Sequence, residues 1–561
     1  MPTPLDPAAL ALQRLYHWEH TNPERVILVQ PMGGGKLREF TWREVGDQVR
    51  RMAAHLKSLS FGHGARVAIL SKNCAYWLMS DLAIWMAGYV SVPLYPTLAS
   101  ATIRSILDHS EARLLFVGKL DDWDAMKPGV PPGLPCIGYP LSPPHDFPTW
   151  DDLMARTAPL AGRPVREADE LSTIMYTSGT TGMPKGVMHS FANFTRAGQA
   201  GMQRISGTGQ DRLLSYLPLS HVVERTLIEH GWLDQGFQVF FAETLDTFTQ
   251  DLQRARPTVF FSVPRLWLKF QQGVHAKLPP KKLDLLLRLP IVGSLIRRKL
   301  LRALGLDQCR QAGSGAAPLP AELLRWYLRL GVPLLEAYGM TENAAVSHAT
   351  VPGVNRPGTV GVPYGDVQSR IDPVTGEVQM RSSSMMLGYY KEPELTRAAF
   401  TDDGWLRTGD KGALDEQGWL RITGRVKDLF KTSKGKYVAP SPIEDRLIMH
   451  PAVDACVVAG ANLGQPLGIV ALAPAAVGKL GQPGEREALE ASLAQHLAAL
   501  NAPLDPHEQL DCLVVVTSPW TVENGFITPT LKIKRNRVED VYAARFEGWV
   551  ALRRPVVWAE G

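Results

Sequence analysis

The feature that most constrains this chain is a loop at residues 176–186, with the sequence Y-T-S-G-T-T-G-M-P-K-G. The residues before it, 171–175, have the alternating, β-prone pattern of a strand. Glycines let the backbone N–H groups of such a loop converge on an anion, hydroxyls can donate to it, and Lys185 adds a positive charge. The loop therefore predicts a polyphosphate site. Its candidate residues are Thr177, Ser178, Gly179, Thr180, Thr181, Gly182 and Lys185.

The loop differs from the Walker A pattern of nucleotide-binding loops. That pattern, G-x-x-x-x-G-K-[ST], requires a second glycine five residues after the first, and Pro184 stands at this distance from Gly179. A solvent-facing turn between two strands is the alternative interpretation of such a composition. We favour a nucleotide site, because Lys185 follows the glycines and hydroxyls in a fixed order.

Length and charge limit the class of protein. A chain of 561 residues exceeds what one hydrophobic core usually contains, so a large domain and at least one smaller domain are expected. Sixty basic residues against 55 acidic ones give a net charge of +5, which is a small excess over a large surface. This charge pattern does not indicate a nucleic-acid partner.

The cysteines and the apolar runs favour a cytoplasmic protein. The five cysteines contain no C-x-x-C pair, so neither a disulfide framework nor a zinc site is indicated. The first residues do not have the pattern of a signal peptide. No window approaches the roughly 18 consecutive apolar residues of a membrane span.

The first part of the chain alternates between strand and helix patterns. Strands are expected at residues 65–70, 89–93 and 114–117, and helices at residues 75–87 and 103–107. This order is typical of a parallel sheet covered by helices. We therefore expect an α/β fold with parallel and mixed sheets in a large N-terminal domain.

Two segments depart from this alternation. Residues 128–148 are rich in proline and lack periodicity, so an irregular surface connection is expected. Residues 283–304 are rich in leucine and arginine and are interrupted by Pro290 and Gly293. We favour a helical connection packed on the large domain, and peripheral contact with an anionic membrane surface is the alternative.

The sequence changes character again near Gly424. Polar residues at 424–428 and 432–436 precede a compact α+β pattern that includes a helix at residues 485–500. We therefore place a domain boundary at Lys427, which divides the chain into residues 1–426 and 427–561.

Five further patterns follow the loop, and their residue types suit a nucleotide and an acid. They are L-P-L-S-H-V-V-E-R at 217–225, G-S-G-A-A-P at 313–318, Y-G-M-T-E at 338–342, G-W-L-R-T-G-D at 404–410 and N-G-F-I-T-P-T-L-K-I-K-R at 524–535. In the third, the Tyr338 ring can pack against adenine, the Thr341 hydroxyl can reach a phosphate, and Glu342 is a suitable ligand for Mg²⁺. The Asp410 carboxylate can accept two ribose hydroxyls, with Arg425 close behind it in the sequence.

Each of these patterns also has a structural interpretation. The small residues Gly313, Ser314, Gly315 and Ala316 allow a base or an acyl chain to approach the backbone closely, but they also suit a tight turn before a helix. Asp410 after a glycine could be turn chemistry, and Lys532 could belong to a solvated basic strand edge. The order and co-occurrence of the patterns favour the functional interpretation.

Taken together, the six patterns resemble the adenylate-forming superfamily, which includes acyl-CoA synthetases, over about residues 40–537. The resemblance implies a small, mobile α+β C-terminal domain that rotates about Lys427. It also implies that His221 lies beside the carboxylate of the acyl substrate and that Lys532 bridges this carboxylate and the α-phosphate of ATP. By the same resemblance Gly339 and Lys431 belong to the nucleotide and cofactor site.

The resemblance implies a reaction: a fatty acid, ATP and CoA give acyl-CoA, AMP and diphosphate through an acyl-adenylate, with Mg²⁺. The K-x-x-x-G spacing from Lys431 to Gly435 and the T-P-T-L-K sequence at 528–532 resemble the long-chain fatty acyl-CoA synthetase branch. Leu268 departs from that branch, which often has an acidic residue there. The alternatives are a ligase that loads a carrier protein, a ligase for medium-chain or aryl acids, and a nucleotide-binding protein without catalysis. A homodimer is also compatible with the sequence.

Overall fold

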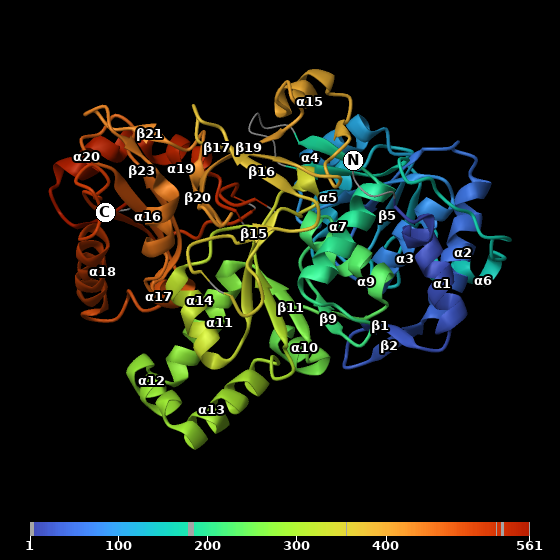
Figure 1. Cartoon of the computed structure of the whole chain (residues 1–561), viewed down its shortest axis with the longest axis horizontal. Helices are drawn as coiled ribbons and strands as arrows, with labels where there is room; N and C mark the ends of the chain where they lie inside the picture. The colour runs from blue at the N-terminus through green and yellow to red at the C-terminus, as the bar shows by residue number, and fades with distance from the viewer. Residues whose placement is uncertain (1–4, 178–183, 355, 523, 529–531, 560–561) are drawn as a thin grey trace.

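The computed structural model describes residues 5–177, 184–354, 356–522, 524–528 and 532–559. The first three quarters of the chain form a larger body, and the C-terminal part gathers beside it (Figure 1, orange to red). Two helices, α12 and α13, project from the larger body at the bottom of this view. Among the described residues, no helix is both long and apolar enough to cross a bilayer.

The largest sheet contains seven strands in the order β18-β8-β7-β4-β3-β5-β6. Their bounds are Arg66–Leu70 (β3), Val90–Leu94 (β4), Leu114–Val117 (β5), Cys136–Gly138 (β6), Leu171–Thr177 (β7), Lys185–Ser190 (β8) and Gly388–Tyr389 (β18). Strands β3 to β7 run parallel, whereas β8 is antiparallel to both of its neighbours. Helix α3 (Ala75–Met86) is largely apolar, with Asp81 as its one charged residue, and every residue in it is buried.

A second sheet, β11-β12-β13-β14-β15, contributes the other wall of the site. Strands β11 (Val259–Ser262), β12 (Gln311–Ser314) and β13 (Leu334–Tyr338) run parallel, so their carboxyl ends meet at one edge. Helices α11 (Pro264–Lys277) and α14 (Ala321–Leu330) pack through Trp267 and Tyr327 into one apolar core with these strands.

Two smaller sheets complete the larger body. Strands β2-β1-β10-β9 have the bounds Leu37–Thr41, Val26–Pro31, Gln238–Phe241 and Arg212–Ser215, and helix α2 (Trp42–Ser58) follows β2. Strands β16-β17-β19-β20 have the bounds Gln368–Ile371, Glu377–Arg381, Leu406–Leu414 and Leu420–Arg425 and are antiparallel throughout.

The C-terminal part has its own sheet, β23-β24-β25-β26, and its own apolar clusters. The strands are Val453–Ala459, Leu467–Leu472, Leu513–Val516 and Val556–Trp558, with helices α16 (Pro440–Leu447), α18 (Glu485–Asn501) and α19 (Arg535–Tyr542) around them. The expected fold, an α/β body with a separate α+β part at the C-terminus, is therefore confirmed.

Residues 128–148 differ from the sequence-based expectation, whereas the leucine- and arginine-rich segment is helical and packed on the larger body, as expected. Residues 128–148 include the short edge strand β6, whose three residues between prolines are too few to show a period. Residues 280–303 form two helices, α12 (Pro280–Arg288) and α13 (Pro290–Ala303), joined by Leu289. Pro290 starts the second helix, as is common for proline in a first helical turn.

Candidate active site

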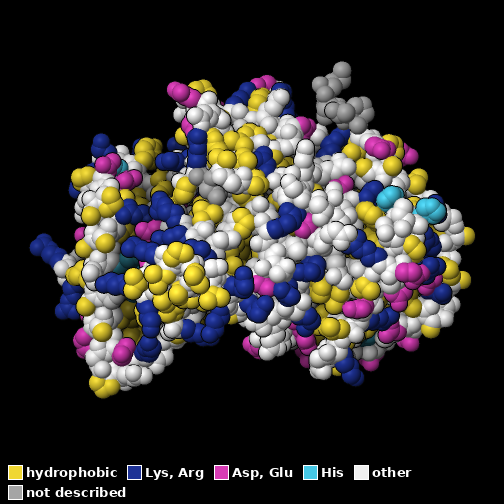
Figure 2. All heavy atoms as spheres, turned by 60° about the horizontal axis from the view of Figure 1, so that its bottom comes forward, with side chains coloured by type: hydrophobic (Ala, Val, Ile, Leu, Met, Phe, Trp, Pro, Cys, Tyr) yellow, Lys and Arg dark blue, Asp and Glu magenta, His cyan; other side chains and the backbone are white. Residues whose placement is uncertain are grey.

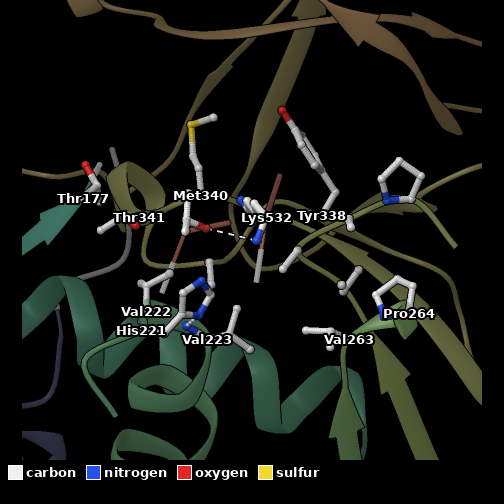
Figure 3. Close-up of a pocket in the computed structure, with 18 of the residues that line it drawn as sticks. Thr177, His221, Val222, Val223, Val263, Pro264, Tyr338, Met340, Thr341 and Lys532 are labelled. Carbon is white, nitrogen blue, oxygen red and sulfur yellow. Dashed lines mark hydrogen bonds between the residues drawn. The ribbon is translucent and has the colours of Figure 1, made fainter. Parts of the chain in front are cut away.

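A cavity of about 1850 Å³ lies where the carboxyl ends of the second sheet face the β7–β8 pair, the β19–β20 pair and the C-terminal part. It brings together most of the residues expected at a nucleotide and acyl site. The lining includes Thr177, Lys185, His221, Gly313, Gly315, Ala316, Tyr338, Gly339, Thr341, Glu342, Asp410, Arg425 and Lys532. Figure 3 shows residues from both parts of the chain in this cavity.

The predicted phosphate loop lies between two antiparallel strands, β7 and β8, whose ends are in register. Thr177 at the end of β7 pairs with Lys185 at the start of β8, so both residues enter the cavity side by side. The predicted loop residues Ser178, Gly179, Thr180, Thr181 and Gly182 lie outside the described residues. A Cβ atom on Gly186 would lie 2.7 Å from Ile174, so this position requires glycine.

Lys185 and Glu342 lie against one tyrosine that sequence reasoning missed. The Lys185 ammonium is 5.4 Å from the ring centroid of Tyr389, and the Tyr389 hydroxyl donates to Oε1 of Glu342 at 2.8 Å. Tyr389 lies on β18, which pairs with β8. The only signal in the sequence was an aromatic residue after Gly388, and this is too common to indicate a site.

The Y-G-M-T-E segment is held from two sides. The buried imidazole of His189 donates from Nε2 to the carbonyl oxygen of Thr341 at 2.7 Å. A Cβ atom on Gly339 would lie 2.5 Å from the backbone of Ala345, so only glycine fits there. The side chains of Thr341 and Glu342 are thereby fixed at the cavity wall.

Tyr338, Asp410 and Arg425 form one hydrogen-bonded group. The Tyr338 hydroxyl donates to Oδ2 of Asp410 at 2.6 Å, and Nε of Arg425 lies 3.0 Å from Oδ1. The pairing of β19 with β20 brings Asp410 opposite Arg425, although fifteen positions separate them in the sequence. The group presents a ring and an ion pair to the same region of the cavity.

The small-residue segment follows β12. Added Cβ atoms would lie 2.5 Å from Phe261 at Gly313 and 2.9 Å from the Ala337 carbonyl oxygen at Gly315, so the backbone itself forms the wall. Ser314 is fully buried, is not part of the lining, and its hydroxyl has no hydrogen-bond partner in the described part of the chain.

His221 lines the cavity beside the apolar residues Val222 and Val223. Its Nδ1 accepts from the N–H of Val223 at 3.3 Å, so a neutral ring carries its proton on Nε2. Burial, together with the cation of Lys532, lowers the pKa of His221 to about 3. The imidazole is therefore neutral at physiological pH.

Lys532 comes from the C-terminal part and enters the cavity between Met340 and Tyr338, above His221 in the view of Figure 3. The N–H of Thr528 donates to the carbonyl oxygen of Lys532 at 2.7 Å, and the N–H of Lys532 donates to Oγ1 of Thr528 at 3.0 Å. These two hydrogen bonds fix the backbone of Lys532. Lys532 is exposed on the cavity surface, although protein closely surrounds its ammonium group. This desolvation and the nearby Arg425 lower the pKa of Lys532, against the attraction of Asp410 and Glu342.

Part of the cavity lining is apolar, and we call this part the apolar end. It includes Val223, Phe260, Val263, Leu268 and Leu323, and Figure 3 shows Val223 and Val263 below Lys532.

Two predicted residues within the described part of the chain do not line the cavity: Lys431 and the buried Ser314. Lys431 lies on the two-residue strand β21 (Phe430–Lys431), with its ammonium 4.8 Å from the ring centroid of Tyr437. Lys427, by contrast, lines the cavity edge.

The two-part fold and the site between its parts define an adenylate-forming type of enzyme. Comparison with known families agrees. The model of the family described as AMP-binding enzyme matches residues 15–390, and that of the AMP-binding enzyme C-terminal domain matches residues 427–550. The chain belongs to the AMP-binding enzyme family.

Similar proteins with known names cover nearly the whole chain. It is 30% identical to the long-chain-fatty-acid–CoA ligase FadD15 of Mycobacterium bovis, over 95% of this chain and 96% of that one. It is 29% identical to long-chain-fatty-acid–CoA ligase 5 of Mus musculus, over 88% and 82%.

Two solved structures share the fold. The adenylation domain of a carboxylic acid reductase from Segniliparus rugosus, in complex with AMP and a co-purified carboxylic acid, has a TM-score of 0.79 at 24% identity, covering 97% of this chain and 94% of that one. The anthranilate CoA ligase AuaEII, in complex with anthranoyl-AMP, has a TM-score of 0.76 at 22% identity, covering 95% and 97%.

Proposed function

We propose that this chain converts a fatty acid, ATP and CoA to acyl-CoA, AMP and diphosphate, with long-chain acids as its substrates. The observation that carries the proposal is one cavity in which Lys532 meets His221 and Glu342 and which continues into an apolar end. The names of the similar proteins support both the thiol acceptor and the long chain.

The polar end of the cavity suits ATP. The Tyr338 ring and the small-residue wall at Gly313 and Gly315 would bind adenine, and the ion pair of Asp410 and Arg425 would bind the ribose. Lys185, Thr177 and Thr341 would contact the phosphates, with the loop residues 178–182 completing this contact.

The acid would lie with its carboxylate near His221 and its chain in the apolar end. Nε2–H of the neutral His221 can donate to one carboxylate oxygen, while Lys532 attracts both the carboxylate and the α-phosphate. A carboxylate oxygen then forms a bond to the α-phosphorus, and the bond from this phosphorus to diphosphate breaks. The contribution of the protein is alignment and charge stabilisation.

The site fits a magnesium ion that is held mainly by phosphates. Glu342 lines the cavity and its Oε1 accepts from Tyr389, which orients the carboxylate. No cluster of three or more potential metal ligands occurs among the described residues, so the phosphates would supply most of the ligands. Bound Mg²⁺ would offset the negative charge of the phosphates.

We further propose that residues 427–561 form a domain that rotates about Lys427 between the two half-reactions. The C-terminal family match beginning at residue 427 supports this boundary. In the second half-reaction the CoA thiol loses its proton, its sulfur bonds to the acyl carbon, and AMP leaves. Lys431 lies outside the cavity in this arrangement. Rotation of the domain would bring it to the cofactor site.

The test is acyl-CoA formation by the purified protein with ATP, Mg²⁺ and a series of acids from acetate to oleate, with AMP and diphosphate measured in parallel. We expect acyl-CoA and AMP in equal amounts with long chains. Diphosphate without a CoA ester would contradict the acceptor and would favour a carrier protein. A preference for short acids would contradict the long-chain assignment.

A further inference from the structure

The helix pair α12–α13 exposes an apolar surface at its tip. Large hydrophobic side chains gather there: Leu285 is 63% exposed, Leu289 46%, Ile291 78%, Val292 40% and Leu295 59%. These are five of the fourteen large hydrophobic side chains that are exposed in the described part of the chain, within eleven consecutive residues. They lie on the two helices and at the turn between them, and the pair projects from the larger body (Figure 1).

Basic side chains flank this tip on both helices. Lys281, Lys282 and Arg288 are exposed on α12, and Arg298, Lys299 and Arg302 are exposed on α13. None of these six forms an ion pair within the described residues, and the only acidic residue from 277 to 302 is Asp284, which lies 4.0 Å from Arg329. Figure 2 shows apolar side chains on this face with Lys and Arg side chains around them.

The opposite face of the pair is firmly packed. Leu283 is fully buried, and Leu287, Ile296, Leu300 and Leu301 pack against the same core that contains Leu268 and Leu323. Arg297 differs from its basic neighbours, because it donates to the carbonyl oxygen of Arg329 at 3.1 Å and ties α13 to α14. The helix pair is therefore anchored to the larger body through this face, and its apolar tip is left exposed.

We propose that the α12–α13 tip docks onto the surface of an anionic lipid bilayer. Apolar side chains at a tip can enter the boundary between headgroups and acyl chains, while flanking lysines and arginines remain among the anionic headgroups. Several cations without acidic partners give the charge complementarity that such a surface requires. A nucleic acid would match the cations but would leave the apolar tip in water.

The position of the tip suits the proposed substrate, and this connection rests on the proposed function. Helix α11 begins at the cavity with Pro264 and leads directly to α12, and Leu268 and Leu323 both line the cavity and share a core with Leu283. Docking would hold the apolar end of the cavity close to a phase in which long-chain acids dissolve. The docking itself can be tested without any activity measurement.

The experiment is co-sedimentation of the full chain with phosphatidylcholine vesicles that contain or lack phosphatidylglycerol. We expect binding only to the anionic vesicles and loss of binding at high salt, because surface charges are screened. The charge variant Arg298→Glu/Lys299→Glu should bind at least about 25-fold more weakly, since each of the two basic residues near such a surface contributes about fivefold. The apolar variant Leu285→Ser/Ile291→Ser should weaken binding to a similar degree.

Matched variants keep the test specific. Leu245→Ser/Val374→Ser removes two hydrophobic side chains that lie outside the tip and are more exposed than Leu285 and Ile291. Arg553→Glu/Arg554→Glu reverses two exposed charges in the C-terminal part. Both should bind as the wild type does, and all variants should keep its thermal unfolding curve.

Three results would overturn the proposal. One is vesicle binding that the tip variants leave unchanged. The second is a loss with the charge variant alone, which would indicate a general anion-binding patch. The third is self-association that needs the tip while vesicles are not bound, which would show that a second copy of the chain covers it. Loss of docking with intact acyl-CoA synthesis, or the reverse, separates this proposal from the proposed function.

Discussion

His221 and Arg225 lie four residues apart on one helical segment, yet their surroundings are opposite. His221 precedes helix α8 (Val222–Glu224) and lines the cavity. Arg225 starts the π-helical turn Arg225–His230 and is fully buried. Its guanidinium pairs with Asp81 and with Glu229, and Nη1 donates to the Thr173 hydroxyl at 2.8 Å.

The difference separates charges that hold the fold from charges that can act on a substrate. Around Arg225 the charged groups have protein partners and aromatic neighbours, including Trp77 and Trp85, and no access to solvent. In the cavity, Lys532 and Lys185 have few protein partners and remain accessible to a ligand. A charge without a fixed partner costs stability but keeps its interaction available.

The largest effect on stability is expected at the buried cluster of Asp81, Arg225 and Glu229. Arg225→Met removes the cation and leaves two buried carboxylates without their partner, which should lower the free energy of unfolding by about 3–5 kcal/mol. Urea unfolding of the purified variant measures this loss. Arg397→Met is the matched control, because Arg397 pairs with Glu394 at the surface, where such pairs contribute about 0–1 kcal/mol. Equal losses in the two variants would contradict the distinction between the regions.

At Lys532 we expect the opposite result, a large loss of activity with little loss of stability. Lys532→Ala should reduce acyl-adenylate formation by about two to three orders of magnitude, or ~3–4 kcal/mol, because the cation between carboxylate and α-phosphate is lost. Stability should hardly change. Pyrophosphate exchange and ATP binding measure the two steps, and Lys479→Ala, an exposed lysine of the same C-terminal part, serves as the control. A variant that loses ATP binding as strongly as turnover would show that Lys532 binds the nucleotide only.

The sequence predicted more of the cavity than of the buried cluster, for physical reasons. Lys185, Tyr338 and Asp410 belong to short patterns with special residue types, and the structure brings these three to one cavity. Asp81 lies within an apolar helix and pairs with Arg225 across 144 positions, and no local pattern encodes such a contact.

The same limit explains two other features of the molecule. Tyr389 reaches Glu342 only because β18 pairs with β8, a long-range contact that the sequence does not show. The exposure of Ile291 depends on which face of α13 packs, and a leucine-rich segment with arginines left two interpretations open. Sequence patterns identify residue types, whereas tertiary contacts decide which face and which partner each one has.

Glu224 lies between His221 and Arg225 in the sequence. The pH dependence of stability that it causes tests whether it resembles the buried charges or the charges of the cavity. Burial raises the pKa of its carboxyl from 4.5 to about 8, although Ser215 and the N–H of Tyr216 donate to it. The folded protein thus holds this proton more tightly than the unfolded chain. As the pH rises from about 4.5 to 8, Glu224 should lower stability by at most about 1.4 kcal/mol per pH unit.

Glu224→Gln carries no titratable proton and should lack this part of the slope. Its stability relative to the wild type should therefore increase between pH 6.5 and 8, as measured by urea unfolding at several pH values. This window avoids the opposite effect of His221, whose lowered pKa destabilises the fold as the pH falls below 6.5. Parallel pH profiles for the two proteins would mean that Glu224 is ionised in the fold, like the charges of the cavity.

The smallest effect is expected at Tyr389. Its hydroxyl is a hydrogen-bond partner of the Glu342 carboxylate, which otherwise remains accessible to a ligand. Tyr389→Phe keeps the ring beside Lys185 and removes the hydroxyl that donates to Glu342 at 2.8 Å. One such hydrogen bond contributes about 1 kcal/mol, so adenylation should fall about fivefold, with a higher Mg²⁺ requirement because the carboxylate is no longer oriented. Tyr437→Phe, at an exposed ring outside the cavity lining, is the control. Unchanged Mg²⁺ dependence would show that Glu342 keeps its orientation without a protein partner. The charges of the cavity would then depend on protein partners even less than the contacts indicate, in contrast to those of the buried cluster.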